Sequence, residues 1–245
     1  AYASMRQERY EDAEFLYLQA LQIREQQLGP EHIMVAFPLH ELGNLYLEQK
    51  RYAEAESLYR RALRIREQSS GSETRLTSDT LNRLARLYFS QQRYTEAEPL
   101  YLRVLRIREQ QLGVESSEVA DPLHGLANLY LRQGRHAEAE PLYQRALQIR
   151  EQKLGQEYPD TLAVMHDYAG FLLVLGKQSE AALLYRRTLA MRERVLGADH
   201  PLTRETGERL QTLLVTLGST EEIAVQGTLR RESEQDTQSR EEESA

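Results

Sequence analysis

The sequence predicts an all-α protein, an α-solenoid of tandem helix–turn–helix repeats, and two observations support this. Strong helix formers such as Leu, Ala, Glu, Arg and Gln dominate the 245 residues, whereas glycine (13) and proline (7) are sparse. No stretch alternates apolar and polar residues for long enough to indicate a sheet. Side chains also recur at intervals of 42 residues, which indicates one supersecondary unit repeated along the chain.

The 42-residue period is carried by tyrosine, leucine and glycine. Its longest ladders are Tyr17, Tyr59, Tyr101, Tyr143 and Tyr185; Leu21, Leu63, Leu105, Leu147 and Leu189; and Gly29, Gly71, Gly113, Gly155 and Gly197. Two shorter tyrosine ladders are Tyr10, Tyr52 and Tyr94, and Tyr46, Tyr88 and Tyr130. Of the 14 tyrosines, 11 lie on such ladders. We therefore expect them to occupy equivalent packing positions in stacked repeats.

Each repeat is predicted to contain two helices. In residues 38–70, Leu39, Leu42 and Leu45 recur at three-residue steps, which is typical of one helix face. A polar turn is expected at 49–51, and a second helix follows and ends near Gly71. Glycine directly after a helix fits the left-handed capping position.

These residues resemble the tetratricopeptide repeat. The family's large–small–aromatic signature corresponds here to Leu42, Gly43 and Tyr46, and its Ala–aromatic–Ala pattern to Ala55, Tyr59 and Ala62. The family's usual unit has 34 residues, and the longer unit here is similar to the repeats of kinesin light chain and nephrocystin-3. The resemblance implies a right-handed superhelical α-solenoid in which the first helices line a concave groove and the second helices form the outer wall.

The repeat array is expected to cover residues 1–225. Its predicted parts are a partial first repeat at 1–28, full repeats at about 33–70, 75–112, 117–154 and 159–196, and a capping helix at about 202–217. Residues 1–7 align with the end of a first helix, which suggests a fragment of a larger protein. Residues 226–245 are polar, acidic and without period, so we expect a disordered tail there.

Two polar rows on the first helices are the candidate ligand site. One row is His40, Asn82, His124 and His166, and the other, four residues later, is Asn44, Arg86, Asn128 and Gly170. Residues i and i+4 share one helix face. In tetratricopeptide proteins such rows commonly hold a peptide backbone or a carboxylate, so the resemblance implies a ligand groove. The alternative is a solvated face that carries residues copied by repeat duplication.

A third periodic feature is an Arg–Glu pair near the end of each second helix. Its members are Arg24/Glu25, Arg66/Glu67, Arg108/Glu109, Arg150/Glu151 and Arg192/Glu193. The pairs could bind an acidic partner. The alternative that we favour is a set of ion pairs between stacked repeats along a solvated wall, since exposed pairs are common and individually weak.

Composition and motifs argue against several other functions. Residues 221–245 carry five of the seven net negative charges, so the repeat body is nearly neutral and has no large basic field for nucleic acid or anionic lipid. No apolar run is long enough to span a membrane. The chain has no cysteine, and its six histidines are not clustered as metal ligands. No phosphate loop, nucleophile elbow or dinucleotide fingerprint is present. We therefore expect no catalytic residues, metal site or cofactor.

The sequence thus favours a non-enzymatic scaffold or adaptor that binds a protein or peptide ligand. The absence of cysteine is compatible with a reducing compartment, and we expect the cytoplasm. The alternative is the C-terminal sensor or regulatory arm of a larger signalling ATPase whose catalytic domain is not in this chain. No feature of the sequence specifies an oligomeric state.

Overall fold

The structure of the protein is a computed structural model that describes the backbone of residues 2–218 and the side chains of residues 9–218. Every regular element in that range is helical, so the prediction of an all-α repeat fold is confirmed. The chain divides into two compact units, residues 1–153 and residues 154–245. The tail predicted at 226–245 lies outside the described residues.

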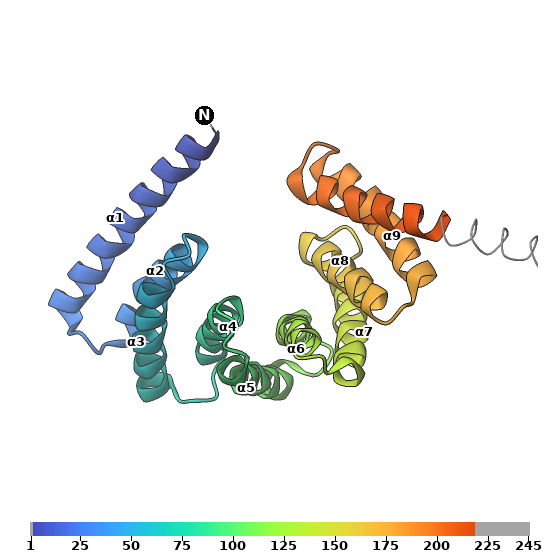
Figure 1. Ribbon diagram of the computed structural model, residues 1–245. Coiled ribbons are helices and arrows are strands. Elements are labelled where there is room, and N and C mark those ends of the chain that lie inside the picture. The colour runs from blue at the N-terminus through green and yellow to red at the C-terminus, as the bar shows by residue number, and fades with distance from the viewer. Residues whose placement is uncertain (1, 219–245) are drawn as a thin grey trace, which may run out of the picture. The chain divides into compact units, whose positions relative to one another are not determined.

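Unit 1 consists of one long helix followed by three helix pairs (Figure 1). The helices are α1 (Tyr2–Leu28), α2 (Ala36–Glu48), α3 (Tyr52–Ser70), α4 (Arg75–Ser90), α5 (Tyr94–Leu112), α6 (Ala120–Arg132) and α7 (His136–Lys153). Short 3-10 turns, η1 (Ile33–Val35) and η2 (Ser117–Val119), precede α2 and α6. The first helices α2, α4 and α6 lie next to one another on one side, and the second helices α3, α5 and α7 lie on the other.

The start of α1 differs from the alignment. Residues 1–7 are expected to be the end of a separate first helix, but residues 2–28 form one continuous helix with no turn. In later repeats the corresponding turn returns the chain against a first helix of 13 to 16 residues.

The tyrosine ladder forms the centre of each pair. Tyr59, Tyr101 and Tyr143 are fully buried, together with the alanine four residues before each of them and the alanine or valine three residues after it. Where α2 meets α3, Val35, Ala36 and Leu39 pack against Ala62 and Ile65. Small residues beside the rings allow close approach: a Cβ at Gly43 would lie 2.7 Å from the Tyr59 ring. The apolar ladders therefore specify the helix pairing.

Two kinds of turn require a positive φ. Gly71, after α3, has φ 93° and ψ 161°, a region that only glycine populates freely, rather than the predicted left-handed helical cap. The turns within repeats place one residue in the left-handed helical region. That residue is Lys50, Gln92 or Gly134, with φ of 61°, 61° and 73°.

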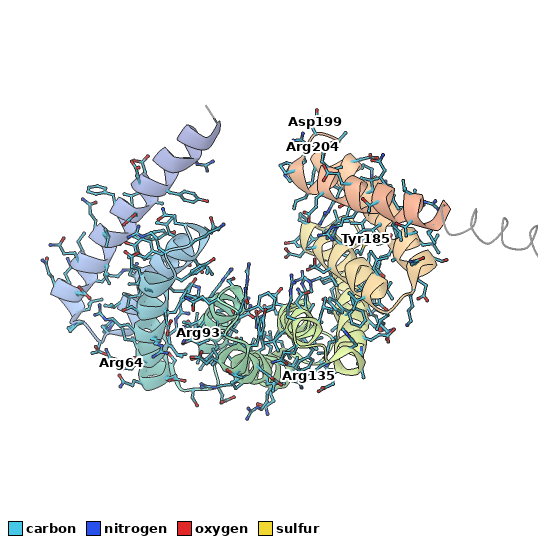
Figure 2. All side chains as sticks on the ribbon, viewed as in Figure 1. Arg64, Arg93, Arg135, Tyr185, Asp199 and Arg204 are labelled. Carbon is cyan, nitrogen blue, oxygen red and sulfur yellow. The ribbon has the colours of Figure 1, made fainter. Side chains whose placement is uncertain are left out.

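A Tyr–Arg–Glu cluster recurs at each junction between repeats of unit 1. In the first, Arg51 stacks on Tyr46, with 3.7 Å between guanidinium carbon and ring centroid, and both contact Glu14 of the preceding second helix. The other two clusters are Tyr88, Arg93 and Glu56, and Tyr130, Arg135 and Glu98. Arg93 and Arg135 are labelled in Figure 2. The cluster joins each first helix to the repeat before it through a cation–π contact and charge-assisted hydrogen bonds.

Four of the five arginines of the Arg–Glu ladder are buried and Arg24 is partly buried, which corrects the expectation of a solvated wall. Arg24, Arg66 and Arg108 each donate a hydrogen bond to the backbone carbonyl ten residues further on, at 2.7, 2.7 and 2.6 Å. Arg66 and Arg108 are almost inaccessible to solvent. Arg66 follows the buried Ala62 by four residues and Arg108 follows the buried Val104 by four, so the ladder position lies on the apolar stripe of the second helix.

The glutamates of the same ladder do form the ion pairs expected between stacked repeats. In unit 1, three of them pair with an arginine 36 residues later, on the next second helix. The pairs are Glu25 with Arg61 (2.6 Å), Glu67 with Arg103 (2.8 Å) and Glu109 with Arg145 (2.7 Å). All six side chains are partly exposed, so each pair adds little stability by itself.

In the described part of unit 2, one helix pair is followed by a further helix. The pair is α8 (Pro159–Val174) with α9 (Gln178–Leu196), and the third helix covers 201–218, where the sequence places a capping helix. Leu210 and Leu213 of that helix pack against Leu172 and Tyr185. Arg192 donates to the Leu202 carbonyl at 2.8 Å, so the ten-residue arginine contact also occurs here.

Candidate functional site

The first predicted row lies deeper in the structure than a solvated groove would require. His40 and Asn82 are each only 7% exposed, whereas His124 and His166 are partly exposed. The imidazole of His40 meets the Tyr59 ring edge-on, with 5.7 Å between centroids, and its Nδ1 lies 3.5 Å from Thr80 Oγ1. Burial, with smaller contributions from Arg66 and Arg83, lowers the pKa of His40 to about 3. His40 is therefore neutral at physiological pH and contributes shape and hydrogen bonding rather than charge.

The same arrangement recurs in both units. His124 lies against Tyr143 in unit 1, and His166 lies against Tyr185 in unit 2, with 6.1 and 5.3 Å between ring centroids. His166 Nδ1 is also 3.2 Å from Thr206 Oγ1. Burial and the nearby Arg192 lower the pKa of His166. The histidine row thus forms a layer over the buried tyrosines.

The second predicted row includes two asparagines that hold tyrosine hydroxyls. Asn44 Oδ1 accepts a hydrogen bond from Tyr59 Oη at 2.8 Å, and Asn128 Oδ1 accepts one from Tyr143 Oη. Each amide also has a neighbour on its own helix, since Asn44 Nδ2 donates to Glu41 and Asn128 Nδ2 lies 3.1 Å from His124 Nε2. The recurrence of asparagine therefore has a structural reason: it satisfies a hydroxyl at the edge of the core.

Arg86 occupies the corresponding position on α4 but differs from the asparagines. Its side chain is exposed, and it forms no ion pair among the residues that the structure describes. It lies close enough to Tyr59 and Tyr101 to affect the pKa of both hydroxyls. Among the predicted site residues of unit 1, Arg86 is the one whose side chain is exposed.

Three further charged residues near this row were not among the predicted site residues. Glu41 and Glu48 lie on α2 three residues before and four residues after Asn44, and Arg83 lies on α4 three residues before Arg86. The sequence signal was the spacing of three and four residues from the second row, which places them on the same helix face. We define the first-helix face of unit 1 as Glu41, Asn44, Glu48, Arg83, Arg86 and Asn128.

A cavity opens at one end of the first-helix face, between α1 and α2. Its volume is about 340 Å³, and it is lined by Arg9, Tyr10, Ala13, Tyr17, Glu41, Asn44, Leu45 and Glu48. The Tyr10 hydroxyl donates to Glu48 at 2.8 Å across it. Unit 2 has a separate cavity of about 590 Å³ beside helix 201–218, with Glu205, Glu208 and Arg209 in its wall.

No three histidine, aspartate or glutamate side chains between residues 9 and 218 come together as a metal site would require. None of the helices that the structure describes is both long and apolar enough to cross a membrane.

Comparisons with known proteins agree with the geometry. A family model described as tetratricopeptide repeat matches residues 1–68, 76–152 and 118–194. The crystal structure of BtubC (BKLC) from P. vanneervenii is similar, with a TM-score of 0.68 and 26% identity over 81% of this chain and 80% of that one. A Podosopora anserina putative kinesin light chain with nearly identical TPR-like repeats is also similar, with a TM-score of 0.61 and 26% identity over 77% and 90% of the two chains. No curated protein sequence matches the chain.

Proposed function

Because this chain belongs to the tetratricopeptide repeat family, we propose that it is a scaffold or adaptor that binds a protein or peptide ligand along a groove lined by its first helices. Repeats of this family generally mediate protein–protein interactions, and proteins built from them are typically non-catalytic. The proposed location is the cytoplasm, because a chain without cysteine has no disulfide that a reducing compartment could break.

One observation carries this proposal: no ion pair within the described residues neutralises the charges of the first-helix face in unit 1, although Glu41 and Glu48 accept hydrogen bonds from Asn44 and Tyr10. The recurring charges between repeats are paired, as in Arg93 with Glu56 and Arg103 with Glu67. Glu41, Glu48, Arg83 and Arg86, in contrast, form no ion pair among the described residues. Exposed polar groups held on rigid helices favour recognition of a partner.

The predicted residues then take different parts in the proposed groove. His40 and Asn82 form its floor, since both are nearly buried. His124 is a more exposed member of that layer in unit 1, and His166 occupies the equivalent repeat position within unit 2. Asn44 and Asn128 keep their carbonyl oxygens on tyrosine hydroxyls and present the edges of their amides, and Arg86 offers a charge. The contacts specific to the ligand would therefore come mainly from the second row and its charged neighbours.

The test uses a random twelve-residue peptide library displayed on phage and selected against the folded chain. Selected peptides are synthesised, and their dissociation constants are measured by fluorescence anisotropy. The groove variant combines Arg86→Ala with Asn128→Asp, whose carboxylate keeps an acceptor for the Tyr143 hydroxyl. The control is Arg106→Ala, an exposed arginine of α5 on the opposite side.

The proposal predicts that the groove variant weakens binding of the selected peptides by up to about fivefold, the upper end for one exposed charge contact. The control should bind as the parent does. Failure to select any peptide, or equal binding by the groove variant and the parent, would reject the first-helix face as the site.

A further inference from the structure

The charge of the first-helix face changes sign between neighbouring helices. On α2, Glu41 and Glu48 are acidic, and on α4, Arg83 and Arg86 are basic. This change does not follow the 42-residue period, since Glu41, Arg83 and Gly125 occupy one repeat position and Asn44, Arg86 and Asn128 another. The sign change is therefore particular to this part of the chain and is not imposed by repeat packing.

The acidic end of the face has the form of a site for a cationic side chain. The cavity between α1 and α2 is walled by the Tyr10 and Tyr17 rings on one side and by Glu41 and Glu48 on the other. Its volume of about 340 Å³ is ample for a lysine or arginine side chain. Aromatic faces and carboxylates are the two groups that bind ammonium and guanidinium ions most effectively.

The basic end lies one helix further along. Arg86 is exposed and Arg83 is partly exposed, and neither forms an ion pair within the described residues. Arg83 lies near both His40 and Tyr59, which places it on the side of α4 that faces α2. Two neighbouring guanidinium groups with free donors are suited to a carboxylate.

Resting on the proposed function, we propose that the ligand is an extended segment with a basic residue and an acidic residue about three positions apart. The basic side chain enters the cavity between α1 and α2, and the acidic side chain contacts Arg83 and Arg86. The spacing follows because packed helices lie about 8–10 Å apart and an extended chain advances about 3.3 Å per residue. The acidic and basic ends of the first-helix face together favour a segment that carries one basic and one acidic residue, here called the dipolar motif, over a uniformly acidic or basic segment.

Arg9 also lies at the rim of the cavity. Its positive charge would compete with the basic side chain of the ligand. Replacing it by alanine should therefore tighten binding by about twofold, the size expected for one exposed like-charge contact.

The test uses synthetic fluorescent peptides of twelve residues on one neutral background. Each carries one lysine and one glutamate separated by zero to eight residues, in both orders, and companion peptides carry two lysines or two glutamates. Binding to the full chain is measured by anisotropy at low and high salt. We expect the tightest binding at a separation of two to four residues in one order, and weakening as salt screens the charges.

Variants of the protein then test which of its charges contact the lysine of the peptide and which contact the glutamate. The double variant Glu41→Gln, Glu48→Gln should weaken binding of the preferred peptide by about three- to tenfold and remove the contribution of the peptide's lysine. The double variant Arg83→Gln, Arg86→Gln should weaken binding by the same amount and remove the contribution of the peptide's glutamate. Exchanging the signs, with Glu41→Arg, Glu48→Arg, Arg83→Glu and Arg86→Glu, should reverse the preferred order. Glu115→Gln and Arg106→Gln, at exposed positions away from this face, are the matched controls. Circular dichroism melting establishes that each variant is folded.

The outcomes separate this inference from the proposed function. If library-selected peptides bind the first-helix face but show no preference for a lysine–glutamate pair, the dipolar motif is wrong and the groove stands. Preference for the two-glutamate peptides over every mixed one would also overturn the motif. Retention of the original order by the sign-exchanged variant would do so as well. If no peptide of either kind binds the first-helix face, both proposals fail.

Discussion

The junctions between repeats and the first-helix face of unit 1 both carry charged residues, but only the junctions repeat. Glu14, Glu56 and Glu98 recur with the same tyrosine and arginine partners at each junction. On the first-helix face, Glu41 is followed one repeat later by Arg83 and then by Gly125. The comparison separates two reasons for a charge in a repeat protein: periodic charges are fixed by packing, and aperiodic charges are free to serve recognition.

The largest effect expected from this comparison is at the buried tyrosines. Tyr101→Ala should reduce the free energy of unfolding by about 3–5 kcal/mol, because Tyr101 is only 2% exposed and its loss leaves a cavity. The comparison is Tyr17→Ala at the same repeat position, where the ring is partly exposed and the cost should be about half as large or less. Urea unfolding measures both. Equal losses would contradict the assignment of the ladder to the core.

A smaller effect is expected at the buried arginines. Arg108→Ala should cost about 2–3 kcal/mol, because it removes the donor to the Glu118 carbonyl and to Asp79 and Asp121. Arg106→Ala, two residues earlier on the exposed side of α5, should cost less than about 0.5 kcal/mol. The difference can be measured by urea unfolding. Similar costs for the two variants would show that burial of the ladder arginine adds nothing.

The smallest effect is expected on the first-helix face itself. Arg83→Gln with Arg86→Gln should change the free energy of unfolding by less than about 0.5 kcal/mol, since neither side chain has an ion-pair partner in the described residues. Thermal melting followed by circular dichroism provides the measurement. A loss of more than about 1 kcal/mol would assign these arginines to the fold, and the contrast with the junctions would disappear.

The helices and their pairing could be predicted from the sequence, because the apolar ladders mark the face of each helix that packs against its neighbour. The turn expected at 49–51 lies between α2 and α3, where the chain needs a residue of positive φ. The burial of Arg66 was also accessible from the sequence, because it follows Ala62 by four residues on the apolar stripe. The prediction placed Arg66 at the surface because of its charge, whereas the Leu76 carbonyl and the Thr80 hydroxyl accept hydrogen bonds from the buried guanidinium.

The candidate site was less accessible from the sequence, because it depends on the orientation of each helix relative to its neighbours. His40 follows Leu39 directly, and only the packing of α2 on α3 determines that its ring meets Tyr59. The asparagines looked like ligand-binding residues, yet their partner hydroxyls lie 15 residues away on the next helix. Glu41 and Arg83 occupy the same repeat position but are different residue types, so no periodic pattern in the sequence marks them.

The arginine that reaches ten residues ahead has a consequence for how the array unfolds. In unit 1, Arg24, Arg66 and Arg108 each link the end of one second helix to the start of the next repeat. The contact spans a single junction, so each arginine couples only nearest neighbours. Weakening one junction should therefore split a single cooperative unfolding transition into two, because the repeats on either side of the weakened junction would unfold independently.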